Sequence, residues 1–556
     1  MKLKKLLATT AVGLVVVGGA AYLARDYLFL HLPGLLAPHV EPNHPVPWQQ
    51  GPATATAAPD ARAPNIIYIL ADDLGFNDIT VNGGGLANGA VPTPNIDALL
   101  RQGVQFTNGY AGNATCSPTR AALMTGRYPT RFGFEFTSTG TPMARYISKF
   151  PNDMGHPTIF HEENVDRQPP QDDQGVPASE ITIAELLKSR DYHTVHLGKW
   201  HLGGGKGMRP EEQGFDESLG FIIGGQMFLP KDDPNVVNAK QDFDPIDKFL
   251  WANLPFSVQY NGGKRFAPNE YMTDYLSTQA VDAIKANRNR PFFMYLAYNA
   301  PHTPLQAKKS DYDALTMIDD STPEGHRLRV YAAMMVALDR GIGRVMAELK
   351  RQGLDNNTMV VFTSDNGGPH YIGLPDINAP YRGWKITFFE GGIRVPFAIR
   401  WPAQIAAGST SPVPVSTFDL FSTAAAAAGA ALPADRPIDG VDLLPWAQGK
   451  ARGEPHKALF WRSGDYRVVQ SGGWKLQHLD LPRRDFLFNL AVDPTERVNL
   501  AASNPAKVAE LNALQRAQDA QQRAPMWPSL TQSAIPVDRP LSFPAKPNED
   551  FIYWSN

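Results

Sequence analysis

Asn65-Ile66-Ile67-Tyr68-Ile69-Leu70-Ala71 is a continuous apolar run that ends at two acids, Asp72 and Asp73. A strand with one solvated face would alternate apolar and polar residues, and this run does not. It therefore predicts a parallel strand that helices cover on both faces.

Similar short apolar runs recur along the chain and are separated by segments with helical periodicity. The runs lie at residues 192–197, 292–298, 359–362 and 395–399, and the helical segments at 183–190, 271–286 and 331–351. Strands that alternate with helices indicate an α/β sheet. We expect this main body to span residues 65–450.

The pattern changes after about residue 450. A hairpin is predicted at residues 466–477 around the turn Ser471-Gly472-Gly473, followed by a strand near 486–490 and an amphipathic helix at 505–522. We expect residues 451–556 to form a smaller C-terminal α+β subdomain that ends in a proline-rich tail.

The N-terminus has the pattern of an export signal, because Lys2, Lys4 and Lys5 precede an apolar stretch that reaches residue 24. Its length nearly meets the roughly 20 residues of a membrane span, so residues 1–24 fit either a cleaved signal peptide or an inner-membrane anchor. Either outcome places the body in the periplasm or outside the cell. Residues 25–64, rich in proline and alanine, are expected to be a tether.

Composition narrows the function. The chain has 556 residues, 43% of them hydrophobic, and a formal net charge of -3, so a large core is expected and a nucleic-acid partner is not. The single cysteine, Cys116, excludes an intrachain disulfide and a cysteine-based zinc cluster. A lone cysteine is usually a small buried hydrophobe, so any chemical role for Cys116 depends on its neighbours.

Four of the predicted strands run directly into polar residues. In an open parallel sheet, ligands bind beyond the carboxyl ends of the strands, so we expect these side chains to meet at one rim. They are, in chain order, Asp72 and Asp73, Lys199 and His201, His302, and Asp365 and Asn366.

Cys116-Ser117-Pro118-Thr119-Arg120 opens a further predicted helix. Proline near the first helical position and the Ala-Leu-Met run that follows place Cys116 at the helix N-terminus. Free backbone amides and the helix dipole favour anions there. A nucleophile at Cys116 could therefore face a charged ester.

These residues resemble the sulfatase family, since Cys116, Pro118 and Arg120 match its Cys-x-Pro-x-Arg signature. The resemblance covers about residues 65–396. It implies an alkaline-phosphatase-like fold, with a mixed, mostly parallel sheet flanked by helices, and a sulfuric ester hydrolase that acts on aryl or carbohydrate sulfates. The supporting elements are Ala71-Asp72-Asp73-Leu74-Gly75, Leu123-Met124-Thr125-Gly126-Arg127, Gly198-Lys199-Trp200-His201-Leu202-Gly203, Pro301-His302, Ser364-Asp365-Asn366-Gly367-Gly368, and Lys385 with Glu390-Gly391-Gly392-Ile393-Arg394.

The resemblance implies that a formylglycine-generating enzyme oxidises Cys116 to formylglycine. Hydration of the aldehyde gives two hydroxyls, one that attacks sulfur and one whose later deprotonation expels sulfate. It also implies that Arg120 holds this diol. A serine or alanine at position 116 would lack the second hydroxyl.

The remaining charged groups are assigned by the same resemblance. Lys199 and Lys385 would hold the sulfate. His201 would accept the proton of the second hydroxyl, while His302, with Lys385, would protonate the departing alcohol. Taken singly, a lysine is usually a solvated surface group and a histidine a hydrogen-bonded core residue, so these roles depend on the motif positions.

Asp72, Asp73, Asp365 and the amide oxygen of Asn366 form an all-oxygen set suited to a hard divalent cation. The resemblance implies one Ca²⁺, with Mg²⁺ as the poorer fit, and leaves room in the coordination sphere for the modified Cys116. Taken singly, each residue could instead belong to an ordinary strand end or turn.

Two other functions stay open at this point. Phosphonate monoester and phosphodiester hydrolases share the fold, and some use formylglycine, so Cys116 does not exclude them. A noncatalytic glycan-binding protein would lack at least one chemical group, and every matched position is filled. His370 and Arg382 are further candidates for lining the substrate pocket, while residues 147–175 match nothing in the family pattern.

Overall fold

The computed structural model describes residues 27, 30–32, 34–149 and 156–556. The predicted signal peptide or anchor, residues 1–24, lies outside the described residues. Within the part of the chain that the structure describes, no helix is both long enough and apolar enough to cross a membrane.

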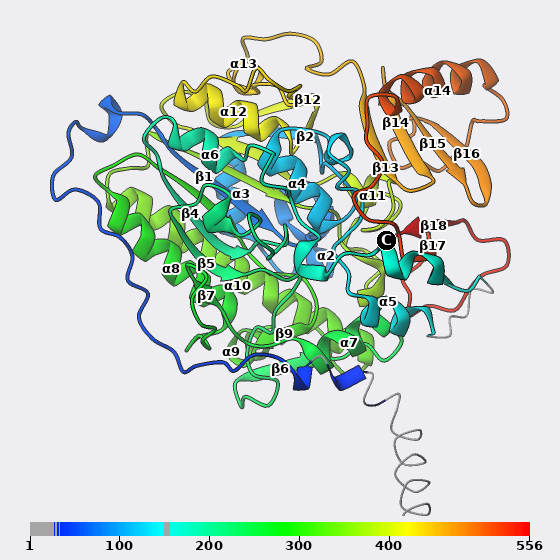
Figure 1. Ribbon diagram of the computed structural model, residues 1–556, viewed down its shortest axis with the longest axis horizontal. Helices are drawn as coiled ribbons and strands as arrows, with labels where there is room; N and C mark the ends of the chain where they lie inside the picture. The colour runs from blue at the N-terminus through cyan, green and yellow to red at the C-terminus, as the bar shows by residue number, and fades with distance from the viewer. Residues whose placement is uncertain (1–26, 28–29, 33, 150–155) are drawn as a thin grey trace, which may run out of the picture.

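A nine-stranded sheet forms the centre of the molecule, in the order β12-β2-β11-β10-β1-β8-β4-β5-β7 (Figure 1). β1 pairs in parallel with both β8 and β10, while β11 and β7 are the antiparallel members. The predicted α/β fold with a mixed, mostly parallel sheet is confirmed. The strands are β1 Asn65–Ala71, β2 Val104–Tyr110, β4 His193–Lys199, β5 Glu217–Phe221, β7 Gln259–Tyr260, β8 Phe292–Ala297, β10 Thr358–Ser364, β11 Phe397–Arg400 and β12 Ser409–Ser416.

Helices cover both faces of this sheet and create two cores. Ile67 and Ile69 of β1 pack with the helices of one face, whereas Ile66, Tyr68 and Leu70 pack with those of the other. This two-sided burial is the physical reason for the unbroken apolar run in β1. The first face carries α3 Pro94–Arg101, α8 Met272–Asn287 and α10 Pro323–Arg351, and the second α4 Cys116–Thr125, α6 Ile183–Lys188 and α12 Asp419–Ala428.

Shorter elements complete the main body. β6 Val236–Ala239 and β9 Leu305–Lys308 form a small antiparallel sheet. The remaining helices are α2 Leu86–Gly89, α5 Thr141–Ser148, α7 Pro245–Asn253, α9 Lys309–Ala314, α11 Glu390–Ile393 and α13 Leu444–Ala447.

A smaller antiparallel sheet beside the main body is formed by β13 Leu459–Ser463, β14 Tyr466–Ser471, β15 Trp474–Asp480 and β16 Arg483–Asn489. α14 Pro505–Asp519 packs against it (Figure 1). The predicted C-terminal hairpin is β14–β15, and the predicted helix is α14. A buried charge group joins the two parts, because Lys475 of β15 contacts Glu390 of the main body at 2.8 Å.

The predicted proline-rich tail is more ordered than the sequence suggests. It contains β17 Thr531–Pro536 and β18 Phe551–Ser555, which pair with each other and with β3 Ile159–Phe160. Arg382 pairs with Asp538 and Asp550 of this tail. The tail pairs with a strand far away in the sequence, and no local pattern reveals such a partner.

The segment expected as a tether runs along the outside of the main body (Figure 1). Trp48 is buried there, and its indole N–H donates to Gln279 at 2.9 Å. The backbone N–H of Glu41 donates to the carbonyl of Arg265 at 2.8 Å.

Candidate active site

The carboxyl ends of neighbouring strands bring the predicted polar residues together at one rim. Asp72 and Asp73 follow β1, and Asp365 follows the adjacent β10. The backbone N–H of Asp73 donates to Asp365 Oδ1 at 3.2 Å. Lys199 ends β4, and His302 follows β8, so four neighbouring strands supply the group.

Cys116 is the first residue of α4, after the extended residue Thr115. Its Sγ lies 3.5 Å from Asp72 Oδ1 and 3.7 Å from Asp73 Oδ1. Burial, with the nearby charge of Asp365, raises the pKa of the Cys116 thiol far above its ordinary value. Burial therefore favours the protonated form of this thiol, which is a weaker nucleophile than a thiolate.

Three buried carboxylates and one amide surround this sulfur. Asn366 donates through Nδ2 to Asp73 Oδ1 at 2.8 Å, while its Oδ1 is buried and has no hydrogen-bond partner. Ligand atoms of Asp72, Asp73, Cys116 and His302 all lie within 4.8 Å of one another. An unpaired amide oxygen beside clustered carboxylates is a donor set that fits a hard divalent cation.

The electrostatics of the acids point the same way. Burial raises the pKa of Asp72 to about 7, although Lys199 opposes this shift. Burial would also raise the pKa values of Asp73 and Asp365, but Lys385 beside Asp73 and Arg120 beside Asp365 hold both below the ordinary value. A bound cation would favour the charged form of all three acids.

The three predicted cations each hold one of these acids. Arg120 Nη2 lies 2.8 Å from Asp365 Oδ2, and its Nη1 donates to the carbonyl of Lys199 at 3.0 Å. Lys199 Nζ lies 2.7 Å from Asp72 Oδ2, and Lys385 Nζ lies 2.7 Å from Asp73 Oδ1. These ion pairs fix the positive groups around Cys116.

Both predicted histidines lie in this group, and burial lowers the pKa of each. That of His302 falls to about 3, and that of His201, which the Lys199 charge lowers further, falls well below its usual range. His302 Nδ1 lies 2.5 Å from the carbonyl of Thr303, so it carries the proton, and Nε2 faces Asp73 at 3.6 Å. His201 Nδ1 is buried without a partner. Each neutral ring has a nitrogen that can accept a proton.

Sequence reasoning missed two tyrosines at this site. Tyr371 donates its hydroxyl to Asp73 Oδ2 at 3.2 Å, and Tyr295 lies 3.3 Å from Arg120 Nη1. Tyr371 lies in a single 3-10 turn, His370–Ile372, which has no spacing signal in the sequence. Tyr295 lies inside a predicted strand, where an aromatic residue is expected as core.

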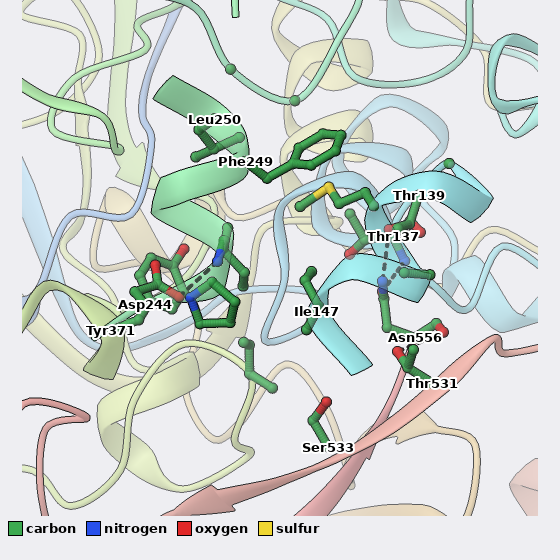
Figure 2. Close-up of a pocket in the computed structure, with 18 of the residues that line it drawn as sticks. Thr137, Thr139, Ile147, Asp244, Phe249, Leu250, Tyr371, Thr531, Ser533 and Asn556 are labelled. Carbon is green, nitrogen blue, oxygen red and sulfur yellow. Dashed lines mark hydrogen bonds between the residues drawn. The ribbon is translucent and has the colours of Figure 1, made fainter. Parts of the chain in front are cut away.

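A cavity of about 1000 Å³ opens beside Cys116 and is lined also by His201, His302 and Lys385. Figure 2 shows part of its wall, with Tyr371 on one side. The expectation that His370 lines the pocket agrees with the structure, whereas Arg382 is not among the lining residues. Its guanidinium is instead occupied by the acids of the C-terminal tail.

Comparisons with known proteins agree with this geometry. The Sulfatase family model matches residues 64–430. N-acetylgalactosamine-6-sulfatase of Mus musculus is 33% identical over 429 residues, which are 75% of this chain and 72% of that protein. Steryl-sulfatase of Mus musculus is 32% identical over 480 residues, covering 76% of this chain and 70% of that protein.

A solved structure is similar over most of its length. It is the crystal structure of Ps i-CgsB in complex with k-i-k-neocarrahexaose, which superposes with a TM-score of 0.68 at 32% identity. The match covers 84% of this chain and 95% of that one. Sequence and structure comparisons therefore agree on one family.

Proposed function

Because this chain belongs to the sulfatase family and is a sulfuric ester hydrolase, we propose that it cleaves sulfate monoesters through a formylglycine formed at Cys116. We further propose that Asp72, Asp73, Asp365 and Asn366 hold one Ca²⁺. The observation that carries the proposal is the position of Cys116 Sγ, 3.5 Å from Asp72, inside a buried group of acids and cations.

Bound Ca²⁺ would supply Lewis-acid polarisation of the ester and of the nucleophile. Hydrated formylglycine would supply one hydroxyl that displaces the alcohol from sulfur and one whose deprotonation releases sulfate. The unpartnered Oδ1 of Asn366 and the clustered carboxylates of Asp72 and Asp73 support this ligand set, and Asp365 joins them through its contact with the backbone N–H of Asp73.

The cations of the chain act on the charge of the sulfuryl group. Lys199 and Lys385 are held in place by Asp72 and Asp73, so their ammonium groups need no reorganisation when the ester binds. Arg120 is fully buried and fixed by Asp365, which suits it to orient the side chain at position 116 one helical turn away.

The two histidines divide the proton transfers. His201 is neutral and has an unpartnered ring nitrogen, so it can accept the proton of the second hydroxyl as sulfate leaves. Lys385 is charged and lies 2.7 Å from Asp73, where it can give a proton to the departing alcohol, while the neutral His302, 3.6 Å from Asp73, can accept a proton through Nε2 and return it to this group. The pKa of Lys385 is raised by Asp73 in spite of burial, so this lysine enters the reaction protonated.

The first test is mass spectrometry of the tryptic peptide 102–120 from protein made with a formylglycine-generating enzyme. We expect the mass of formylglycine at Cys116, together with hydrolysis of 4-nitrophenyl sulfate. Cys116→Ser and protein made without the modifying enzyme should both be inactive. Thiol alone in an active enzyme would refute the proposal.

The same assay separates sulfate from phosphorus chemistry. Matched 4-nitrophenyl sulfate, phosphate and phenylphosphonate esters share one leaving group, so their kcat/KM values compare only the groups attacked at sulfur or phosphorus. We expect the sulfate ester to be the best substrate, and a preference for the phosphonate would replace this function with that of a phosphonate hydrolase.

The export signal predicted at the N-terminus supports a periplasmic or extracellular site of action.

A further inference from the structure

The cavity beside Cys116 changes character with distance from the sulfur. At the reactive end it is lined by His201, His302 and Lys385. Much of the remaining wall comes from two helices that pack on each other, α5 and α7, and from the C-terminal tail. The reactive end suits the sulfate group of an ester, and the rest of the wall selects the alcohol to which the sulfate is attached.

The two helices present apolar side chains to the cavity. Met143 and Ile147 come from α5, and Ile246, Phe249 and Leu250 from α7. Figure 2 shows Ile147, Phe249 and Leu250 along this wall. The tail adds Leu541, Phe543 and Trp554.

Several polar side chains of the same wall already have partners within the protein. Asn556 Nδ2 donates to Thr139 Oγ1 at 2.7 Å, and Asn556 Oδ1 accepts the backbone N–H of Thr137 at 2.9 Å (Figure 2). Ser533 Oγ lies 3.2 Å from Thr158 Oγ1. A sugar ring needs donors and acceptors that are free to meet its hydroxyls, whereas the oxygen and the nitrogen of the Asn556 amide already have protein partners.

Charge on the wall is equally sparse. Asp244 is buried, and its carboxylate accepts the N–H groups of Ile246 and Asp247 at the start of α7, both at 3.0 Å. Burial raises the pKa of Asp244 to about 8, so it adds little negative charge at neutral pH. Among the described residues that line the cavity there is one lysine, Lys385, and one arginine, Arg265. Arg265 also borders a second, polar cavity of about 410 Å³.

We propose that the cavity accepts the sulfate monoester of an apolar, ring-containing alcohol. The sulfate lies at Cys116 and the ring system between α5, α7 and the tail. This inference rests on the proposed function and narrows it, because a multiply sulfated glycan would require more cations than this wall supplies. Aromatic and aliphatic side chains bury apolar surface against such rings, and the rings bring no polar group that would be left without a hydrogen bond.

Binding to the unmodified thiol form tests the inference without turnover. Isothermal titration calorimetry in the presence of Ca²⁺ would compare 2-naphthyl sulfate with galactose 6-sulfate. We expect 2-naphthyl sulfate to bind at least about tenfold more tightly, with a negative heat-capacity change from apolar burial. Equal or tighter binding of galactose 6-sulfate would overturn the inference.

Variants in α7 locate the effect. Phe249→Ala should weaken 2-naphthyl sulfate binding about tenfold and narrow the selectivity over galactose 6-sulfate by the same factor. Lys248→Ala is the matched control, because Lys248 precedes Phe249 on the same helix and is not among the residues that line the cavity. This variant should leave both affinities unchanged. An unaltered affinity in Phe249→Ala would refute the placement of the rings.

Turnover by the matured enzyme keeps this inference separate from the proposed function. If 4-nitrophenyl sulfate is hydrolysed but the thiol form prefers the sugar sulfate, the sulfatase mechanism stands and the apolar ligand class falls. If 4-nitrophenyl sulfate is not hydrolysed by formylglycine-containing protein, the mechanism falls, while preferential binding of 2-naphthyl sulfate would still support the apolar cavity.

Discussion

Replacement of Lys475 by methionine should destabilise the protein and lower its activity together. Lys475 Nζ lies 2.8 Å from Glu390 Oε1 and 3.0 Å from Glu496 Oε1, and all three side chains are fully buried. Methionine preserves the apolar stem but leaves two carboxylates facing each other. Removing one partner from a buried ion pair costs about 3–5 kcal/mol in the free energy of unfolding.

Other contacts of these carboxylates limit the cost. Glu390 keeps Arg394 at 3.3 Å and the hydroxyl of Tyr110 at 3.1 Å. Burial raises the pKa of Glu496 to about 7 even with Lys475 present, so Glu496 should take up a proton in the variant. We therefore expect the lower half of the range, about 3–4 kcal/mol.

Activity should fall because Glu390 belongs to the segment that carries Lys385. The backbone N–H of Glu390 donates to Glu496 Oε2 at 2.6 Å, and Lys385 is held by its own N–H to the carbonyl of Gly368 at 3.0 Å. Loss of Lys475 removes the ion pair that anchors this segment at Glu390. Displacement of the Lys385 ammonium would reduce kcat/KM for 4-nitrophenyl sulfate even at room temperature, where the variant is still folded.

Urea unfolding monitored by tryptophan fluorescence gives the stability, and the matched control is the double variant Lys475→Met, Glu496→Gln. The second substitution removes the excess negative charge at nearly constant shape, so it should recover about 2 kcal/mol of the loss. A single variant within 1 kcal/mol of the wild type, or a double variant no more stable than the single, would refute this account of the buried charges.

Three further outcomes are expected. Removal of divalent ions with EDTA should abolish hydrolysis, and added Ca²⁺ should restore it. Asn366→Ala should raise the Ca²⁺ concentration for half-maximal activity about tenfold. Full activity in EDTA would exclude a role for the metal. The pKa of His456 is raised by Asp419 despite burial. The ion pair of His456 with Asp419 therefore stabilises the protein fully below about pH 6.5, and this stabilisation is lost as pH rises through the raised pKa. The difference in Tm between the wild type and His456→Gln should shrink from pH 6 to pH 9, and a constant difference would contradict this. Arg382→Ala removes the cation that holds Asp538 and should lower the free energy of unfolding by about 1–2 kcal/mol. It should also speed limited proteolysis near residues 537–550. Unchanged cleavage would count against the contact between Arg382 and the tail.

Residues that follow the strands of the parallel sheet could be placed from the sequence. Asp72, Lys199 and Asp365 lie beyond the carboxyl ends of strands that the hydrophobic pattern reveals, and parallel pairing brings such ends to one edge. The helix start at Cys116 was predictable for a local reason, since Pro118 and the apolar run after it specify the first turn. Local patterns and one topological rule therefore suffice for the reactive centre.

Contacts between distant segments could not be placed in this way. β17 pairs with β3, which lies more than 350 residues earlier, and each strand has few residues and little alternation. Tyr371 contacts Asp73 from a single 3-10 turn that no sequence pattern indicates. The wall of the cavity depends on such contacts, so the sequence pattern left the leaving group of the ester open between a phenol, a steroid and a sugar.

Part of the cavity wall comes from a segment of the chain that lies beyond the span of the family match. Cys116 and its partners lie within residues 64–430, the span of the family match, whereas Phe543 and Trp554 of the wall lie beyond it. The centre is constrained by ion pairs such as that of Lys199 with Asp72, where a small displacement exposes a buried charge. Apolar walls tolerate exchange of side chains at constant volume. A change of substrate in such a protein therefore needs substitutions in α5, α7 and the tail, and the ion pairs around Cys116 can stay as they are.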